Sequence, residues 1–304
     1  MDLPALTFRG DLLAAGWTDR EVRRMRRSGA LRPVRRGAYL SAPDLSPDTA
    51  EARHALLVRA TLPHLAPGWA LSHVSAAVLL GLPAWGLATD RVHITRHGTG
   101  GGRLTRGVHR HVAPLRDDEL ITVDGMRCTD AGRTVNDLAR TVPFEQAVVV
   151  ADAALATLPL DTSELLAAQS RAALWHGAPQ ALRAIRFADD GARSPGESRS
   201  RVAMFQAGLP RPVLQYEVLS AAGRFLGCVD FAWPQLRTVG EFDGRVKYGR
   251  LLKPGQDAGD VVFEEKVRED AIRAMDLRMA RWVWRDLDHF APVADRLRRC
   301  FAIT

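Results

Sequence analysis

The sequence predicts a mixed α+β protein of several domains, and three observations support this fold class. The chain has 304 residues, of which 46% are apolar and 25% charged, which suits a globular protein with more than one hydrophobic core. Helical stretches alternate along the chain with short strand-like runs. A linker at 190–193 precedes the last third of the chain. We expect domains at 1–60, 61–190 and 191–304.

Composition excludes several classes of protein. No apolar run approaches the roughly 18 residues that span a bilayer, and the first residues lack a signal-peptide pattern, so we expect a cytoplasmic protein without membrane contact. Cys128, Cys228 and Cys300 are far apart, which indicates neither a disulfide framework nor a zinc site. The net charge of +7 favours polyanionic partners such as nucleic acid, although a genome biased toward arginine would also produce it.

The first 40 residues predict two helices. Residues 10–16 form a short helix that Gly16 ends, and Thr18 with Glu21 fits a capping box at the start of the next. On this second helix Val22 and Met25 point inward. The opposite face carries four arginines by helical spacing, namely Arg20, Arg23, Arg24 and Arg27.

Two short strands around a basic turn at 31–40, with Arg35 and Arg36, follow the helices. This order is that of a winged helix-turn-helix, whose second helix enters the major groove while the wing contacts phosphates. We therefore expect the six arginines of the helix and turn to bind double-stranded DNA. A small helical subdomain with a solvated arginine face is the alternative.

The closing residues of this segment, Arg36-Gly37-Ala38-Tyr39-Leu40, and the stretch from Ser72 through Asp137 support a family resemblance. They resemble the winged helix and the following region of AbiEi-type abortive-infection (type IV) antitoxins. The resemblance implies an autoregulatory DNA-binding protein of a toxin-antitoxin system, with a cognate toxin as a partner.

The middle domain shows packing patterns and little chemistry. A helix from about Leu71, strands at 91–96 and 107–113 joined by a glycine-rich hairpin loop, an Asp124-Gly125 turn and alanine-rich helices over 143–188 are expected. Arg133 and Asp137 are spaced to pair on a helix. His73, His93, His109 and His111 have no carboxylate or cysteine at ligand spacing, so we expect hydrogen-bonded or exposed histidines and not a metal site.

The last third predicts a helix, a three-strand meander, a second helix and a final strand. Ser194-Pro195-Gly196-Glu197 starts the first helix, so capping alone would explain Glu197. Strands are expected at 213–218, 224–232 and 236–243, the second helix at 262–275 and the last strand at 277–284. The order predicts a mixed α/β domain.

Acidic residues in two of these strands indicate a metal site. Asp230 interrupts an apolar strand, and Glu241 and Asp243 share one face of the next strand. Asp230, Glu241 and Asp243 would hold Mg²⁺ or Mn²⁺, which prefer oxygen ligands and support phosphodiester hydrolysis. Lys247 and Lys266 are the nearest lysines, and a paired or solvated strand edge is the alternative.

Several blocks of this region together resemble the nuclease-like domains related to the very-short-patch repair endonuclease, within the PD-(D/E)XK superfamily. The blocks are Ser194 to Glu197, Val229 to Pro234, Glu241 to Gly244, Glu265 to Asp270 and Arg281 to Trp284. The resemblance implies a restriction-endonuclease-like three-layer α/β fold, with Glu197 as the helix acid and Asp230 and Glu241 as metal ligands. Asp243 stands where the superfamily has lysine, so Lys247 or Lys266 would have to act in its place.

Two functions follow from these patterns. One is a metal-dependent DNA endonuclease with Glu197, Asp230, Glu241, Lys247 and Lys266 as catalytic residues. The other is a non-enzymatic antitoxin-type regulator with a degenerate nuclease domain.

Overall fold

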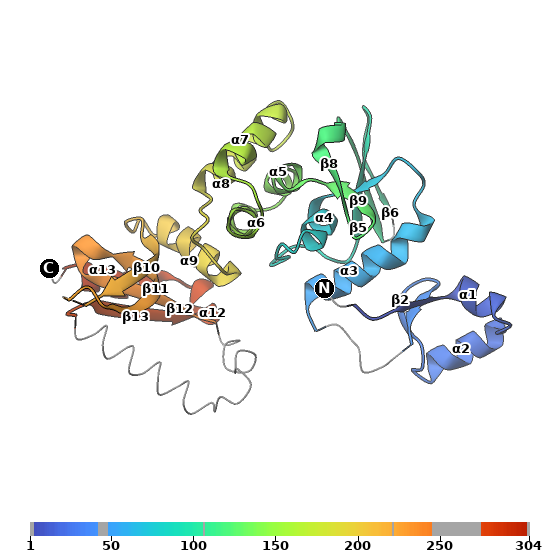
Figure 1. Cartoon of the computed structure of the whole chain (residues 1–304), viewed down its shortest axis with the longest axis horizontal. Helices are drawn as coiled ribbons and strands as arrows, with labels where there is room; N and C mark the ends of the chain where they lie inside the picture. The colour runs from blue at the N-terminus through green and yellow to red at the C-terminus, as the bar shows by residue number, and fades with distance from the viewer. Residues whose placement is uncertain (1–2, 42–47, 106, 221, 245–274, 303–304) are drawn as a thin grey trace. The chain divides into compact units, whose positions relative to one another are not determined.

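The structure, a computed structural model, describes residues 3–41, 48–105, 107–220, 222–244 and 275–302, and it is of the mixed α/β class (Figure 1). The chain divides into two compact units. One comprises Met1–Val150 with Leu158–Arg186, and the other Ala151–Thr157 with Phe187–Thr304. Within the described residues, no helix has the length and apolar character needed to cross a membrane.

The N-terminal segment has the predicted helix pair and hairpin. A capping box of Thr18 and Glu21 begins the second helix, and Val22, Leu31 and Tyr39 form a small core. The first strand was not predicted; it completes a three-stranded antiparallel sheet in the order β1-β3-β2. The elements are β1 (Leu6–Phe8), α1 (Arg9–Ala14), α2 (Asp19–Arg27), β2 (Arg32–Arg35) and β3 (Ala38–Leu40).

A six-stranded mixed sheet in the order β6-β7-β5-β4-β9-β8 follows. Val58, Leu71, Ile94 and Cys128 belong to the core between the sheet and its helices. The elements are α3 (Ala50–Thr61), β4 (Ala70–Leu71), α4 (His73–Leu79), β5 (Val92–His97), β6 (Arg103–Thr105), β7 (Val108–Ala113), β8 (Leu120–Val123), β9 (Met126–Thr129) and α5 (Ala131–Thr141).

The expected hairpin between residues 91 and 113 is wrong. β5 and β7 lie side by side but run parallel, with His93 opposite His109. The glycine-rich loop after β5 leads instead into β6, which pairs antiparallel with the other edge of β7. A short strand of three residues therefore changes the direction of the connection. The Asp124-Gly125 turn joins β8 to β9 as predicted, with both residues at positive φ.

The alanine-rich helices are confirmed as α6 (Phe144–Thr157), α7 (Thr162–Arg171) and α8 (Ala178–Phe187). Arg133 and Asp137 pair on α5 at 2.8 Å, as their spacing predicts. The last turns of α6 belong to the second unit, where Asp152 receives an ion pair of 2.5 Å from Arg201.

The second unit is built on a four-stranded sheet in the order β10-β11-β12-β13, in which β12 and β13 are parallel. Met204 of the first helix and Leu297 of the last join Phe231, Phe242 and Trp282 in one core on this sheet. The elements are α9 (Pro195–Gln206), β10 (Val213–Leu219), β11 (Phe225–Trp233), β12 (Thr238–Asp243), β13 (Arg278–Val283), α12 (Trp284–Leu287) and α13 (Ala291–Ala302).

The helix start at Ser194 and the four predicted strands are confirmed, whereas α12 and α13 were not predicted. The helix expected over 262–275 falls almost wholly outside the described residues, as do Lys247 and Lys266.

Candidate functional site

The exposed face of α2 carries the arginines that the helical spacing predicts. Arg20, Arg23, Arg24 and Arg27 are all exposed, while Val22 is 2% exposed on the inner face. Helix formation therefore places four guanidinium groups on one surface without burying any of them. Such a surface attracts phosphate groups and, in the hairpin that follows, Arg36 is exposed as well.

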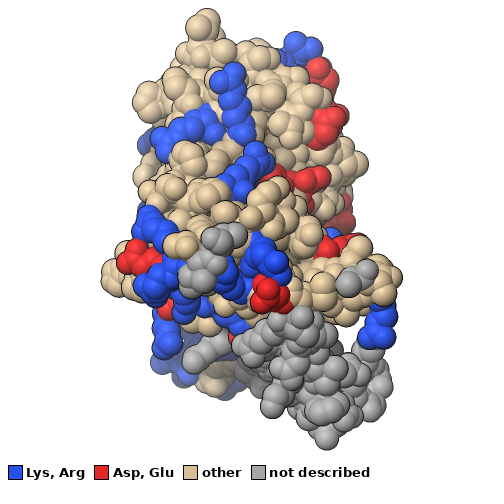
Figure 2. All heavy atoms as spheres, turned by 90° about the vertical axis from the view of Figure 1, so that its left-hand side faces the viewer, with Lys and Arg blue, Asp and Glu red and all other residues tan. Residues whose placement is uncertain are grey.

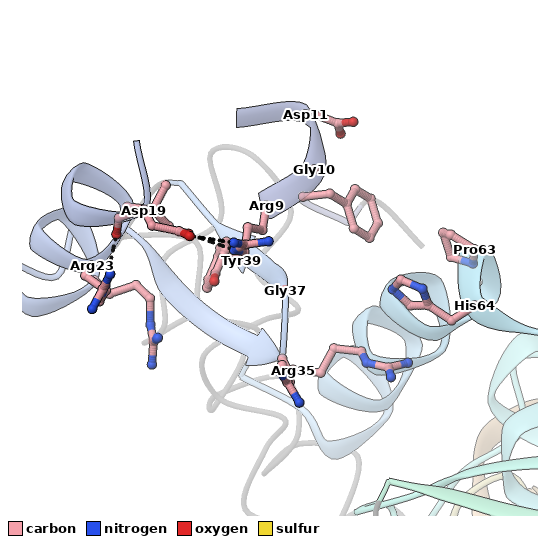
Figure 3. A pocket seen from close by; sticks show the side chains of 14 residues that line it. Arg9, Gly10, Asp11, Asp19, Arg23, Arg35, Gly37, Tyr39, Pro63 and His64 are labelled. Carbon is pink, nitrogen blue, oxygen red and sulfur yellow. Dashed lines mark hydrogen bonds and ion pairs between the residues drawn. The ribbon is translucent and has the colours of Figure 1, made fainter. Parts of the chain in front are cut away.

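A pocket of about 960 Å³ lies between this helix, the hairpin and the residues that follow α3. Figure 3 shows the guanidinium groups of Arg9 and Arg23 beside Asp19, with Arg35 at the hairpin. Arg9 pairs with the Asp19 carboxylate at 2.7 Å, and Arg23 Nε donates to the Asp19 carbonyl at 3.2 Å. The hydrogen bond from Arg9 lowers the pKa of Asp19, so this acid stays ionised and fixes Arg9.

Arg35 is the most informative lining residue of this pocket. Its Nη1 atom is buried and has no hydrogen-bond partner among the described residues, and burial lowers the pKa of the Arg35 guanidinium. A buried donor without an acceptor is costly. A phosphate oxygen entering the pocket would supply the missing acceptor.

Two arginines of the pocket were not among the predicted DNA contacts. Arg9 precedes the predicted helix, and Arg26 is next to the inward-facing Met25 on α2. Arg26 lies 5.9 Å from the centre of the Tyr39 ring and lines the pocket with Arg23, Arg35 and Arg36. In the sequence, Arg26 was recognisable only as part of a run of basic residues. Its contact with Tyr39 of β3 shows which way the Arg26 side chain faces.

The second unit also presents arginines at its surface. Figure 2 shows the face at the left of Figure 1, where basic side chains spread widely and acidic ones gather mainly along one edge. All the basic side chains coloured there are arginines, because the three lysines of the chain lie outside the described residues. Among the described residues of the second unit the arginines and the acids are equal in number, so the basic excess of the described residues belongs to the first unit.

The predicted acidic site lies on β11 and β12. Their antiparallel register pairs Phe231 with Gly240 and Ala232 with Val239, which places Asp230 beside Glu241. Asp230 and Glu241 thus continue the sheet face on which Ala232 and Val239 pack, and Asp243 follows two residues later on the same strand. The register therefore puts two of the three predicted metal ligands, Asp230 and Glu241, in adjacent positions on neighbouring strands.

Each of these carboxylates already has a protein partner. Asp230 Oδ2 accepts a hydrogen bond of 2.8 Å from the Phe242 amide, and Glu241 Oε2 pairs with Arg281 of β13 at 2.8 Å. Arg281 was not predicted as a site residue, because its contact depends on the parallel pairing of β12 with β13. Among the described residues, Asp230, Glu241 and Asp243 do not form a group of three donor atoms close enough for one ion.

Glu197 acts as a helix cap, as the capping pattern predicts. Its carboxylate accepts hydrogen bonds from the Ser194 hydroxyl at 2.7 Å and from the Arg193 amide at 3.0 Å. A third comes from the side-chain amide of Gln215 at 2.9 Å. Gln215 is on β10, which pairs with β11, the strand that bears Asp230.

Three histidines of the first unit come together in space, which the sequence did not predict, and they are hydrogen-bonded, as expected. Among the described residues, His73, His93 and His111 form a group whose potential ligand atoms lie within 4.8 Å of one another. His111 Nε2 is 3.2 Å from His93 Nδ1, and the rings of His73 and His111 stack at 3.9 Å. Three separate elements supply these residues, so spacing along the chain does not reveal the group.

Burial keeps these histidines neutral. It lowers the pKa of His93 to about 2 and that of His111 to about 4. The pKa of His73, which is 5% exposed, is also lowered well below its usual value by burial. Neutral imidazoles are the form that binds metal ions.

Comparison with known proteins identifies two relatives. No protein-family model matches the sequence. Uncharacterized protein Rv2248 of Mycobacterium tuberculosis (strain ATCC 25618 / H37Rv) is 33% identical over 194 residues, which cover 60% of this chain and 68% of the relative. Uncharacterized protein MT2308 of Mycobacterium tuberculosis (strain CDC 1551 / Oshkosh) matches to the same extent. The chain therefore belongs to the same family as these two mycobacterial proteins.

Proposed function

We propose that the protein binds duplex DNA through its N-terminal segment and that the sheet of the second unit hydrolyses phosphodiester bonds with Mg²⁺ or Mn²⁺. The observation that carries the first part is the arginine surface of α2 and the hairpin. The N-terminal order of two helices and a hairpin on a three-stranded sheet supports the interpretation of this segment as a winged helix-turn-helix.

The DNA contacts divide into two groups by position. The exposed guanidiniums of α2 would enter the major groove, as recognition helices do. Arg36 and the half-buried Arg35 of the hairpin would contact phosphates. Phosphate contacts contribute affinity without sequence preference, whereas base contacts decide specificity.

A binding assay tests the contacts of the hairpin. Anisotropy of labelled random-sequence duplex is measured with wild type, with Arg35→Met/Arg36→Ala, and with Arg59→Ala/Arg186→Ala. The control pair is exposed and lies on α3 and α8. We expect the hairpin variant to bind more weakly and the control to bind as wild type. Equal loss in both variants would show that total charge and not this surface determines binding.

The second part rests on the register of β11 and β12. Asp230 and Glu241 share one face of the sheet, and two carboxylates are sufficient for Mg²⁺ when substrate phosphates and waters complete its shell. The donor set therefore fits the ion. Bound there, the ion would activate a water and neutralise charge on the phosphodiester. Arg281 holds the Glu241 carboxylate at 2.8 Å and thereby orients it.

The test is nicking of supercoiled plasmid with and without Mn²⁺. We expect activity in wild type and in Asp295→Asn, an exposed acid on α13, and loss of activity in Asp230→Asn and Glu241→Gln, with DNA binding retained. The variant Asp243→Lys tests whether the lysine that the wider superfamily has at this position can act in this protein. Metal-independent nicking, or equal nicking by all variants, would refute the hydrolytic part.

A regulatory role without catalysis is the second candidate, and one observation favours it. Both acids already have protein partners: Asp230 accepts a hydrogen bond from a backbone amide, and Glu241 pairs with Arg281. This is the arrangement of structural side chains on a sheet. An antitoxin-type regulator would bind its own operator sequence tightly and cut no DNA with any metal. Selection of bound sequences from a random pool, run beside the nicking assay, distinguishes the two candidates.

A further inference from the structure

We propose that His73, His93 and His111 form a binding site for one divalent transition-metal ion, with zinc the best match to their nitrogen donors. The group lies entirely in the first unit, so the proposal stands independently of the acidic site in the second unit. Imidazole nitrogens suit zinc, copper, nickel and iron and not Mg²⁺. Three histidines with one open position are a known zinc arrangement.

The fold places these residues from three directions. His73 follows β4 as the first residue of α4, His93 lies on β5 and His111 on β7. β5 pairs with β4 on one side and with β7 on the other. Since Thr95 is opposite His111 in this register, His93 and His111 occupy the same sheet face, and the start of α4 covers it.

One separation in the group already fits a bound ion. Zinc–nitrogen bonds of about 2.0–2.1 Å in a tetrahedron place neighbouring nitrogens about 3.4 Å apart. His111 Nε2 and His93 Nδ1 are 3.2 Å apart. The group as a whole lies within 4.8 Å, and because the rings of His73 and His111 stack at an interplanar angle of 16°, one of these two rings would have to tilt for both nitrogens to point at one ion. The hydrogen now shared by His93 and His111 would move to the outer nitrogen of one ring.

A buried hydroxyl pair orients His73. Its Nδ1 lies 3.0 Å from Ser72 Oγ, which also accepts a hydrogen bond of 2.7 Å from Thr95 Oγ1. Both hydroxyl residues are fully buried. Metal-binding histidines typically donate their second ring nitrogen to such a partner, and this leaves His73 Nε2 for the ion. His73 also has a φ of +49°, a strained conformation that is concentrated at functional sites.

The arginines near the group are paired with acids. Arg133 pairs with Glu119 at 2.9 Å and with Asp137 at 2.8 Å, and Arg140 pairs with Asp137 at 2.9 Å. Arg171 also lies 3.5 Å from Glu119. The two carboxylates offset part of the positive charge that a bound cation would meet. The histidines themselves are neutral, so none of them has to lose a proton before it binds the ion.

A pocket gives access to the site. It has a volume of about 420 Å³ and is lined by His73 and His111 together with Arg140, Trp175 and the glycines of the loop after β5. An ion bound by the histidines would be reachable through this pocket. Water or a small anion from the pocket would be its fourth ligand.

The experiment measures zinc bound per chain by the full-length protein after dialysis, together with affinity by competition with a chromophoric chelator. We expect one ion in wild type and in His64→Ala, whose exposed histidine lies outside the group, and loss of that ion in His93→Ala and His111→Ala. Ser72→Ala keeps all three ligands and is expected to weaken binding by about 10–100-fold. Equal binding by all variants, or no stoichiometric ion in wild type, overturns the proposal.

A measurement on wild type alone guards against variants that fail to fold. The cobalt-loaded protein is expected to show the intense visible bands of a tetrahedral site. X-ray absorption of the zinc form is expected to show three nitrogen donors at about 2.0 Å. Coordination by oxygens alone would overturn the proposal, because the ion would then be elsewhere. Neither readout depends on DNA binding or cleavage.

Discussion

The Arg201–Asp152 pair is predicted to be the strongest single electrostatic link in the second unit. Arg201 Nη1 contacts Asp152 Oδ2 at 2.5 Å, and the two side chains are 4% and 0% exposed. Arg201→Met leaves a carboxylate inside the protein without its counter-ion. Breaking one partner of such a buried pair costs about 3–5 kcal/mol. The exposed Arg211 also pairs with an acid, Asp189, at 2.6 Å, and Arg211→Met is expected to cost at most about 1 kcal/mol.

The pH dependence of this loss has a definite sign. Burial raises the pKa of Asp152 even with Arg201 present, and removal of Arg201 raises it further. A carboxyl group whose folded-state pKa exceeds its unfolded value favours the folded state as it binds a proton. The destabilisation of Arg201→Met is therefore largest at neutral pH and becomes smaller as the pH falls toward that raised pKa.

Urea unfolding followed by circular dichroism and tryptophan fluorescence measures both effects, at pH 7 and pH 5. The double variant Asp152→Asn/Arg201→Met removes the buried charge but keeps an acceptor for the Asp189 amide, which is 2.9 Å from Asp152 Oδ1. With the single variant Asp152→Asn completing the double-mutant cycle, we expect a coupling energy of about 1–3 kcal/mol. A loss below about 1 kcal/mol in Arg201→Met at pH 7, or equal losses at the two pH values, would refute the reasoning.

Two further predictions concern packing and thiol reactivity. A methyl group on Gly196 would overlap the Phe242 ring, whereas one on Gly10 would meet no atom within 4 Å. We therefore expect Gly196→Ala to lower the free energy of unfolding by about 1–3 kcal/mol and Gly10→Ala to be neutral, and equal melting temperatures for the two variants would contradict the packing described. Cys128 is fully buried, and burial raises its pKa to about 11. A disulfide reagent should modify at most two of the three thiols in the native protein and all three in denaturant, and rapid modification of Cys128 would show that the core opens.

Local signals in the sequence predicted the local structure well. The capping box at Thr18 and the Ser194-Pro195 helix start were recognisable because each pattern satisfies backbone groups within four residues. The Asp124-Gly125 turn was recognisable for the same reason, since the two residues tolerate positive φ. The Arg133–Asp137 pair followed from helical spacing. None of these depends on how distant segments pack.

Features that depend on strand pairing were not predicted. The parallel pairing of β5 with β7 depends on the short strand β6, and three residues are too few for a clear alternation. The histidine group depends on the same pairing and on the start of α4, so His109 and His111 alone were recognisable as sharing a face. At the acidic site, Asp230 and Glu241 were paired correctly by alternation, whereas Arg281 required the β12–β13 register.

The salt dependence of DNA binding tests the central claim, that the N-terminal arginine surface contacts phosphates. Each phosphate contact contributes about 0.9 to the slope of log affinity against log salt concentration. We predict that Arg35→Met/Arg36→Ala, which removes the two proposed phosphate contacts of the hairpin, reduces the magnitude of this slope by about 1.8 relative to wild type, and that Arg59→Ala/Arg186→Ala leaves it unchanged. An unchanged slope in the first variant, or equal reductions in both, would contradict the account.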